Sequence, residues 1–186
     1  MCIIKDPPFA ESSLYKPAVF NSFSSLSYVI CAYFLWRSGV PRVRILAAPL
    51  VVLGLFSFLF HFTLCTYFGN QDVFWMKVVL WLFVIPRDCD VYTVLQTLFF
   101  ALTYFDSVYL NMFEAYMHAL ALMIVPAFCY CDRTVYKTAL AFVAACLGWG
   151  VSELFYKTIP WIAYFQLLAV LHCVSALTIY ICCLLY

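Results

Sequence analysis

Charged side chains are scarce in this sequence. Lysine and arginine together number 10, and aspartate and glutamate 9, among 186 residues, which leaves a net charge of +1. A chain so close to neutral has no basic footprint for nucleic acid, so we expect no nucleic-acid partner. The glycine-rich phosphate loops of nucleotide-binding domains and the ligand spacing of zinc fingers are also missing. These absences exclude the common nucleotide- and nucleic-acid-binding classes.

Two further features that would point to a secreted or metal-binding domain are missing. The ten cysteines are scattered, mostly within apolar runs, where cysteine behaves as a small hydrophobic side chain more often than as a disulfide partner. Cys129 and Cys131 are too closely spaced for a metal-binding knuckle. Residues 1–17 are polar and lack the apolar centre of a cleavable signal peptide.

The chain is instead rich in hydrophobic side chains. Two thirds of its residues (67%) are hydrophobic and 20% are aromatic, which is the composition of an integral membrane protein. Seven apolar runs predict an all-α bundle of seven transmembrane helices, several near the shortest length that crosses about 30 Å of hydrocarbon. The runs are residues 18–36, 45–67, 72–86, 91–105, 112–130, 138–156 and 161–186. We predict an interfacial arm over residues 1–17 and one transmembrane domain over residues 18–186.

Basic residues in the predicted loops are divided unevenly between the two sides of the membrane. One side carries Arg37, Arg42, Arg44, Arg87, Arg133 and Lys137, whereas the other carries Lys5, Lys16 and Lys157. Because basic loops face the cytoplasm or matrix, we predict the N-terminus outside and the C-terminus inside. This orientation puts His61 in the outer half of its span and Asp72 at the outer end of the next.

The most informative polar residues are Ser57, His61 and Asp72. Ser57 and His61 are four residues apart, so they share one face of a helix. Asp72 follows eleven residues after the histidine. A histidine and an aspartate at membrane depth are costly, so they should face the protein interior and a partner. A buried histidine satisfied by a hydroxyl is the simple interpretation, and a catalytic or metal-binding group is the alternative.

The segment 42–72 resembles the second and third transmembrane segments of the alkaline ceramidases. These enzymes belong to a superfamily of seven-helix membrane hydrolases that includes the adiponectin-receptor-like proteins. The shared pattern is a serine, three residues, then Phe-His-x-Thr-Leu, with an aspartate eleven residues after the histidine. It is matched here by Ser57, Phe60, His61, Thr63, Leu64 and Asp72. The resemblance implies a zinc-dependent amide hydrolase fold with a cavity for a ceramide-like acyl chain.

The last predicted span departs from the family pattern at one position. Alkaline ceramidases carry Gln-x-His-x-x-x-His there, and both histidines join the earlier histidine on zinc. Gln166 and His172 match this pattern, but Leu168 replaces the first of the two histidines. A hydrolytic zinc site needs about three protein ligands and one open position for water. With His61 and His172 alone, Asp72 would have to bind the metal and could not orient the water.

The beginning of the first span also departs from the family. The family pattern Glu-x-x-Asn-x-x-Ser becomes Ala18-x-x-Asn21-x-x-Ser24 in this chain. The missing glutamate implies loss of a calcium ligand, because too few acidic residues remain for an all-oxygen cage. We expect Asn21 and Ser24 to form hydrogen bonds with neighbouring helices. We also expect Gly148 and Gly150 to permit close helix packing.

The sequence is compatible with three functions. The first is a ceramidase-like protein that has lost hydrolysis, in which Ser57 and Asp72 are vestigial, and that serves as a structural or lipid-binding subunit of a membrane assembly. The second is an active zinc ceramidase, completed by Asp72, by His118 of a Glu114–His118 pair, or by a lipid head group. The third is a transporter or channel.

No cofactor is expected if hydrolysis has been lost, and zinc is expected if the ceramidase is active. The partners expected are membrane lipid and other membrane subunits. The resemblance implies an ER or Golgi membrane, with the mitochondrial inner membrane as the alternative for a complex subunit.

Overall fold

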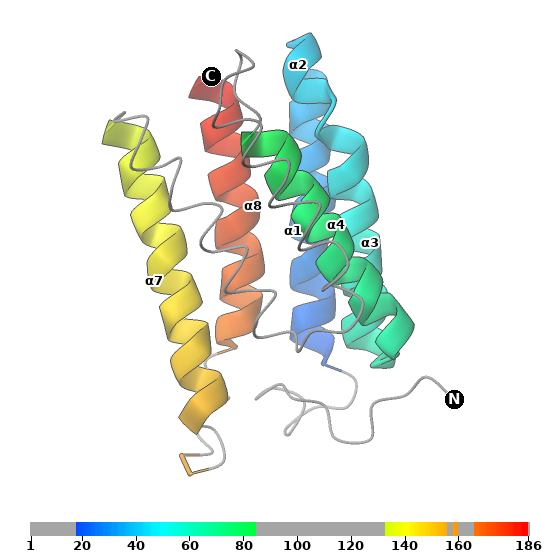
Figure 1. Ribbon diagram of the computed structural model, residues 1–186, viewed down its shortest axis with the longest axis vertical. Helices are drawn as coiled ribbons and strands as arrows, with labels where there is room; N and C mark the ends of the chain where they lie inside the picture. The colour runs from blue at the N-terminus through cyan, green and yellow to red at the C-terminus, as the bar shows by residue number, and fades with distance from the viewer. Residues whose placement is uncertain (1–17, 85–132, 156–157, 160–165, 186) are drawn as a thin grey trace.

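The computed structural model describes residues 18–84, 133–155, 158–159 and 166–185, and the elements in this part of the chain are helices (Figure 1). They are α1 (Val19–Arg37), α2 (Pro41–Arg44), α3 (Ala47–Thr63), α4 (Thr66–Val84), α7 (Arg133–Phe155) and α8 (Leu167–Leu185). The predicted all-α class is therefore confirmed at this level. The N-terminal arm, the predicted fourth and fifth spans and the Glu114–His118 pair lie outside the described residues.

The five long helices run alternately up and down, with α1 at the centre (Figure 1). Helix α1 packs against α3 on one side and α8 on the other, while α4 packs on α3 and α7 packs on α8. The short α2, the start of α7 and the end of α8 lie at one end of the bundle, which we call the α2 end. The starts of α1, α4 and α8 and the end of α3 meet at the opposite end. Polar residues near those four termini are consequently neighbours.

The helix boundaries differ from the sequence prediction between residues 63 and 72. The predicted second span continued to residue 67 and the third began at Asp72, but α3 ends at Thr63 and α4 begins at Thr66. The chain turns at Leu64, whose φ of 53° is left-handed. Such a conformation is uncommon for leucine and is usually supplied by glycine or asparagine. Asp72 therefore lies in the second turn of α4, and not at its entry.

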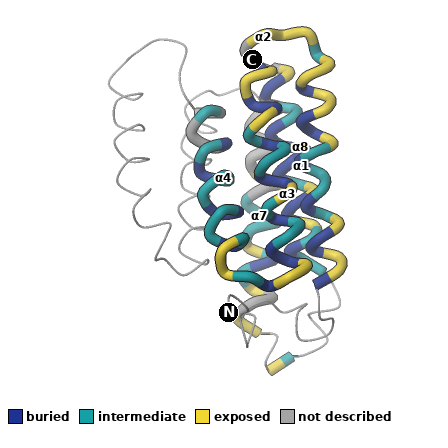
Figure 2. The backbone as a smooth tube through the Cα atoms, turned by 90° about the vertical axis from the view of Figure 1, so that its right-hand side faces the viewer, coloured by how far each residue is buried: buried dark blue, intermediate teal, exposed yellow. Residues whose placement is uncertain are grey.

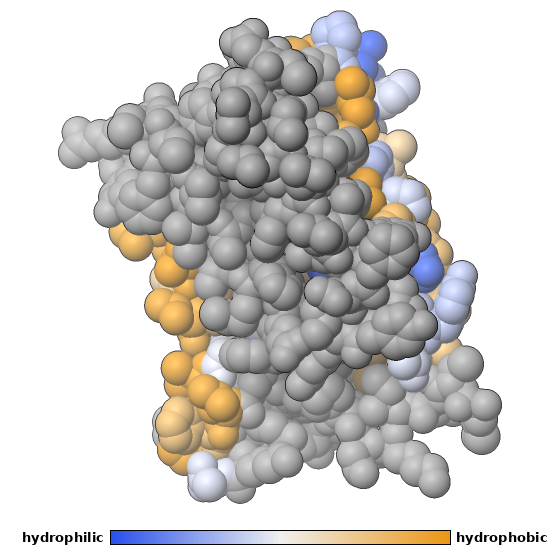
Figure 3. Space-filling model, viewed as in Figure 1, coloured by the Kyte–Doolittle hydropathy of each residue, from blue (hydrophilic) through white to orange (hydrophobic). Residues whose placement is uncertain are grey.

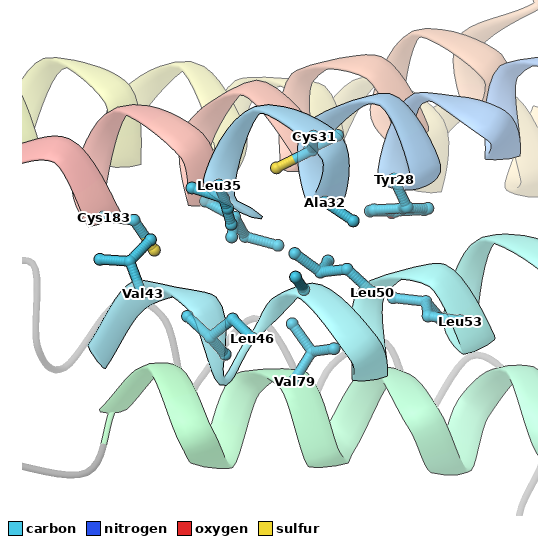
Figure 4. Close-up of a cluster of buried hydrophobic side chains, with 13 residues drawn as sticks. Tyr28, Cys31, Ala32, Leu35, Val43, Leu46, Leu50, Leu53, Val79 and Cys183 are labelled. Carbon is cyan, nitrogen blue, oxygen red and sulfur yellow. The ribbon is translucent and has the colours of Figure 1, made fainter. Parts of the chain in front are cut away.

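A hydrophobic cluster fills the bundle towards the α2 end (Figure 4). It is formed by side chains from α1, α3, α4 and α8, together with Val43 of α2 and Leu46 just before α3. Leu35 and Leu50 are both 0% exposed at its centre. Figure 2 shows buried positions recurring along α1, α3 and α8, with exposed positions between them. The buried polar residues of the candidate site lie towards the opposite end of the bundle.

The outer surface of the described helices is largely apolar. On α7 the exposed residues Leu140, Leu147, Val151 and Leu154 recur at helical spacing, and hydrophobic side chains dominate the lower left of Figure 3. Helix α1 is the one described helix that is both long and apolar enough to cross a membrane, whereas the apolar stretches Ala47–Thr63 and Leu167–Ile181 are shorter. These features are compatible with a membrane protein.

Close helix packing occurs at Gly54, whereas the two glycines expected from the sequence meet no close neighbour among the described residues. A Cβ atom added to Gly54 would lie 2.8 Å from Cγ2 of Val29 and 3.1 Å from the carbonyl oxygen of Ser25. The same atom at Gly148 would meet only Leu167, at 4.0 Å, and at Gly150 it would meet nothing within 4 Å among the described residues. Gly54 is therefore the residue that lets α1 and α3 approach, and the expectation for Gly148 and Gly150 stays a prediction.

Candidate functional site

Two buried histidines mark the candidate site. His61 is in the last turn of α3 and His172 is in the second turn of α8, and their exposed fractions are 0% and 2%. Their ring centroids are 5.2 Å apart, with an interplanar angle of 52°. The antiparallel course of α3 and α8 relative to each other places them together despite their distance in sequence. We call these two rings the histidine pair.

A row of hydroxyl groups connects the histidine pair to Asp72. The Nδ1 atom of His172 lies 2.9 Å from Oγ of Ser24 and 3.3 Å from Oγ of Ser25, both on α1. Oγ of Ser25 lies 2.9 Å from Oγ of Ser57 on α3, and Ser57 in turn hydrogen-bonds the carboxyl group of Asp72 on α4. The row therefore links α8, α1, α3 and α4 through one series of hydrogen bonds.

The number of hydroxyl protons indicates which nitrogen of His172 carries its proton. Ser25 donates its one proton to the carbonyl oxygen of Asn21, at 2.8 Å. Ser24 donates to the carbonyl oxygen of Asn21, at 3.0 Å. Both serine protons are then used, so Nδ1 of His172 acts as the donor to the two serines. The proton-free nitrogen is then Nε2, which makes no hydrogen bond to the described residues.

Further hydroxyl groups fix the helix turn that carries His172. The carbonyl oxygen of His172 accepts hydrogen bonds from Oγ of Ser27, at 3.2 Å, and Oγ of Ser175, at 3.0 Å. The hydroxyl of Tyr28 also bonds Ser175, and its ring packs edge-on against the His172 ring at 6.0 Å. Ser25, Ser27, Tyr28 and Ser175 were missed by sequence reasoning. The density of serine between positions 22 and 27 was the available signal for two of them, Ser25 and Ser27.

The remaining sequence-predicted residues surround the histidine pair. Asn21, 0% exposed, is one turn before Ser25 on α1, and its carbonyl oxygen accepts hydrogen bonds from Ser24 and Ser25. Gln166 directly precedes α8 with a left-handed φ of 51°. Leu168 is fully buried and packs with Phe60, Trp149 and Leu171. The position that would hold a third histidine is thus inside an apolar cluster.

The described residues of the candidate site do not supply the ligand set of the zinc that the family resemblance implies. Among the described residues, no group of three or more histidine, cysteine, aspartate or glutamate side chains is placed to hold a metal ion. A zinc site with an open position needs about three protein ligands. The histidine pair supplies two, Asp72 is bonded to Ser57, and Leu168 offers only hydrocarbon. No hydrolytic step through a metal follows from this arrangement.

The hydroxyl row can be tested by removing its link to Asp72. Because Asp72 is buried (5% exposed), Ser57→Ala should leave its carboxylate without this donor and lower the free energy of unfolding by about 1.5–3 kcal/mol. Asp72→Asn should also destabilise the fold, and the double variant should lose less than the sum of the single losses. Urea unfolding in detergent measures all three. Additive losses would show that Ser57 and Asp72 do not interact.

Known protein families, characterised proteins and solved structures were each compared with this chain, and no match was found in any of the three.

Proposed function

We propose that this chain is an integral membrane protein with ceramidase-like architecture that does not hydrolyse lipid amides. It serves as a structural or lipid-holding subunit of a membrane assembly. The apolar outer surface, the length of α1 and the alternating helices support placement in a membrane. In this proposal the chain crosses seven times, with its N-terminus outside and the α2 end inside. That end carries the arginines of α2 and the start of α7.

The observation that carries the proposal is the burial of Leu168. This residue is four positions before His172, so the two share one face of α8. Its side chain is 0% exposed and contacts Phe60, the neighbour of His61, within an apolar cluster. A leucine here supplies no metal ligand and offers only hydrocarbon. Loss of a ligand weakens zinc binding, because the remaining imidazoles gain less coordination for the water they lose.

The hydroxyl row supports the same proposal. In the ceramidase resemblance, Ser57 and Asp72 are catalytic groups that act on a zinc-bound water. In this chain Ser57 bonds both Ser25 and Asp72, and His172 bonds Ser24 and Ser25. These hydrogen bonds join side chains of four helices, and Nε2 of His172 is left without a partner among the described residues. In this proposal, the hydrogen bonds hold the four helices together around an interior that holds lipid.

Purified native protein should contain no stoichiometric zinc and should not cleave ceramide. The physical reason is that the described residues place no third ligand beside the histidine pair. Elemental analysis and release of fatty acid from ceramide in detergent micelles measure the two properties, with His61→Ala as the background. Zinc-dependent turnover by the native protein that disappears in His61→Ala would contradict the proposal and support the active ceramidase instead.

A further inference from the structure

The α2 end carries two exposed arginines, Arg37 and Arg44, on a surface that is otherwise largely apolar. Arg37 is in the last turn of α1, where a positive charge is favoured by the helix dipole. Arg44 ends α2 after a tight turn at Gly39, whose φ of 77° is left-handed. This turn brings α2 back over the end of α1. We propose that Arg37 and Arg44, together with Trp36, which precedes Arg37 and contacts Arg44, bind the head group of an anionic phospholipid.

Arg44 is held in a fixed position. Its Nε donates a hydrogen bond to the carbonyl oxygen of Trp36, at 3.2 Å, and its guanidinium carbon lies 5.6 Å from the centre of the Trp36 ring. The terminal nitrogens of the guanidinium are not used by this hydrogen bond. A planar guanidinium with two free terminal groups matches the paired oxygens of a phosphate. Because the group is already ordered, binding would lose little side-chain entropy.

No carboxylate of the described residues neutralises these arginines. The sequence has no aspartate or glutamate between Glu11 and Asp72. In the described part of the chain the acidic residues are Asp72, near the start of α4, and Glu153, near the end of α7. Both of those helix ends lie away from the α2 end (Figure 1). The described surface at the α2 end therefore offers positive charge to an external anion.

The surroundings of the two arginines favour a lipid over a free anion. Tyr33 and Trp36, both 59% exposed, share a face of α1 with Arg37. Val40 and Ile45, 45% and 61% exposed, flank α2. Exposed tryptophan and tyrosine beside arginine are typical of the level of lipid head groups. A ligand with a phosphate and acyl chains can contact both kinds of surface at once, whereas inorganic phosphate contacts only the arginines.

The inference rests on the proposed placement in a membrane, and the test separates the two. Detergent-purified protein is titrated with phosphatidylglycerol or phosphatidylcholine, and bound lipid is counted by native mass spectrometry. Native protein should prefer phosphatidylglycerol. Each of Arg37→Ala and Arg44→Ala should weaken that binding about fivefold, as expected for one cation near an anionic head group. Arg44→Lys should also weaken it, because it keeps the charge and loses the fixed guanidinium.

The matched control is the double variant Arg133→Ala, Lys137→Ala, which removes two positive charges from the same end of the bundle. It should leave the preference for phosphatidylglycerol unchanged. An equal loss in this control, no preference in the native protein, or full displacement by soluble glycerol 3-phosphate would each overturn the head-group site. Recovery of the native protein in phosphatidylcholine vesicles tests the membrane placement separately, since failure there would contradict the proposed function whatever the lipid preference.

Discussion

Leu168→His should give this protein a three-histidine zinc site. The new imidazole would be four residues before His172, on the same face of α8, in a side-chain position that is fully buried beside Phe60. With His61 it would complete three histidine ligands and leave one position open, the usual composition of a catalytic zinc site. We expect about one zinc per chain, together with higher thermal stability when zinc is added, because the metal binds the folded state.

The scaffold is suited to this change because the histidine pair is already arranged. Ring centroids 5.2 Å apart are close enough for both rings to reach one ion. The bonds of Nδ1 of His172 to Ser24 and Ser25 leave its Nε2 as the proton-free nitrogen. A histidine that ligates metal with one nitrogen and hydrogen-bonds with the other is the common arrangement in metalloproteins. The native chain therefore retains the supporting contacts of a metal site without its full ligand set.

The matched control for this experiment is Leu171→His. Leu171 belongs to the same buried cluster and is 2% exposed, but it is adjacent to His172 and points about 100° away around the helix. It should take up no zinc, as should Leu168→His combined with His61→Ala. Equal zinc content in Leu168→His and Leu171→His, or none in a folded Leu168→His, would show that the histidine pair is not a metal scaffold.

Gly54→Ala should destabilise the bundle more than Gly148→Ala or Gly150→Ala. The new Cβ would lie 3.1 Å from a backbone carbonyl oxygen of α1, which cannot move without shifting the helix. We expect a loss of about 1–3 kcal/mol in the free energy of unfolding, which is typical of overpacking. The shift would also stretch the bond between Ser25 and Ser57, since Ser57 is one turn from Gly54 on α3.

Gly150→Ala is the control for this prediction, because an added Cβ there meets nothing within 4 Å among the described residues. Alanine is the better helix former by about 1 kcal/mol, so this variant should be neutral or slightly more stable. Chemical unfolding in detergent, followed by circular dichroism, compares the two with the native protein. A stable Gly54→Ala, or equal losses of unfolding free energy in both variants, would show that close packing at Gly54 does not stabilise the fold.

The parts of the fold that the sequence predicts well are those with clear boundaries. The first span was predicted at residues 18–36 and α1 runs from Val19 to Arg37, because Pro17 and the Arg37-Ser38-Gly39 sequence interrupt a long apolar run. The boundary between α3 and α4 was missed. The left-handed residue there is Leu64, which carries no turn signal, and apolar side chains continue on both sides of it.

The candidate site shows a similar division. The family pattern pointed to Ser57, His61, Asp72 and His172, and the structure brings these side chains together through the histidine pair and the hydroxyl row. Ser25 joins them although no sequence pattern singled it out. Helix α1 packs between α3 and α8, and only this packing shows that Ser25 contacts both Ser57 of α3 and His172 of α8. Sequence periodicity gives the buried face of a helix but does not identify the helix that covers it.

The bond between Ser24 and His172 joins positions 148 residues apart, and this has a consequence for biogenesis. In a membrane, as we propose, α1 would be inserted early in synthesis with a row of hydroxyl groups along one side. Helix α3 follows soon and supplies Ser57 to Ser25, and Ser24 donates to the carbonyl oxygen of Asn21 within α1. The hydroxyl of Tyr28, however, bonds Ser175 of α8, and Ser24 contacts His172 only once α8 is present. Polar groups at membrane depth are costly until they are bonded. The nascent chain therefore exposes a polar stripe until its last helix is inserted, and a chain truncated before α8 should be retained by membrane chaperones and degraded.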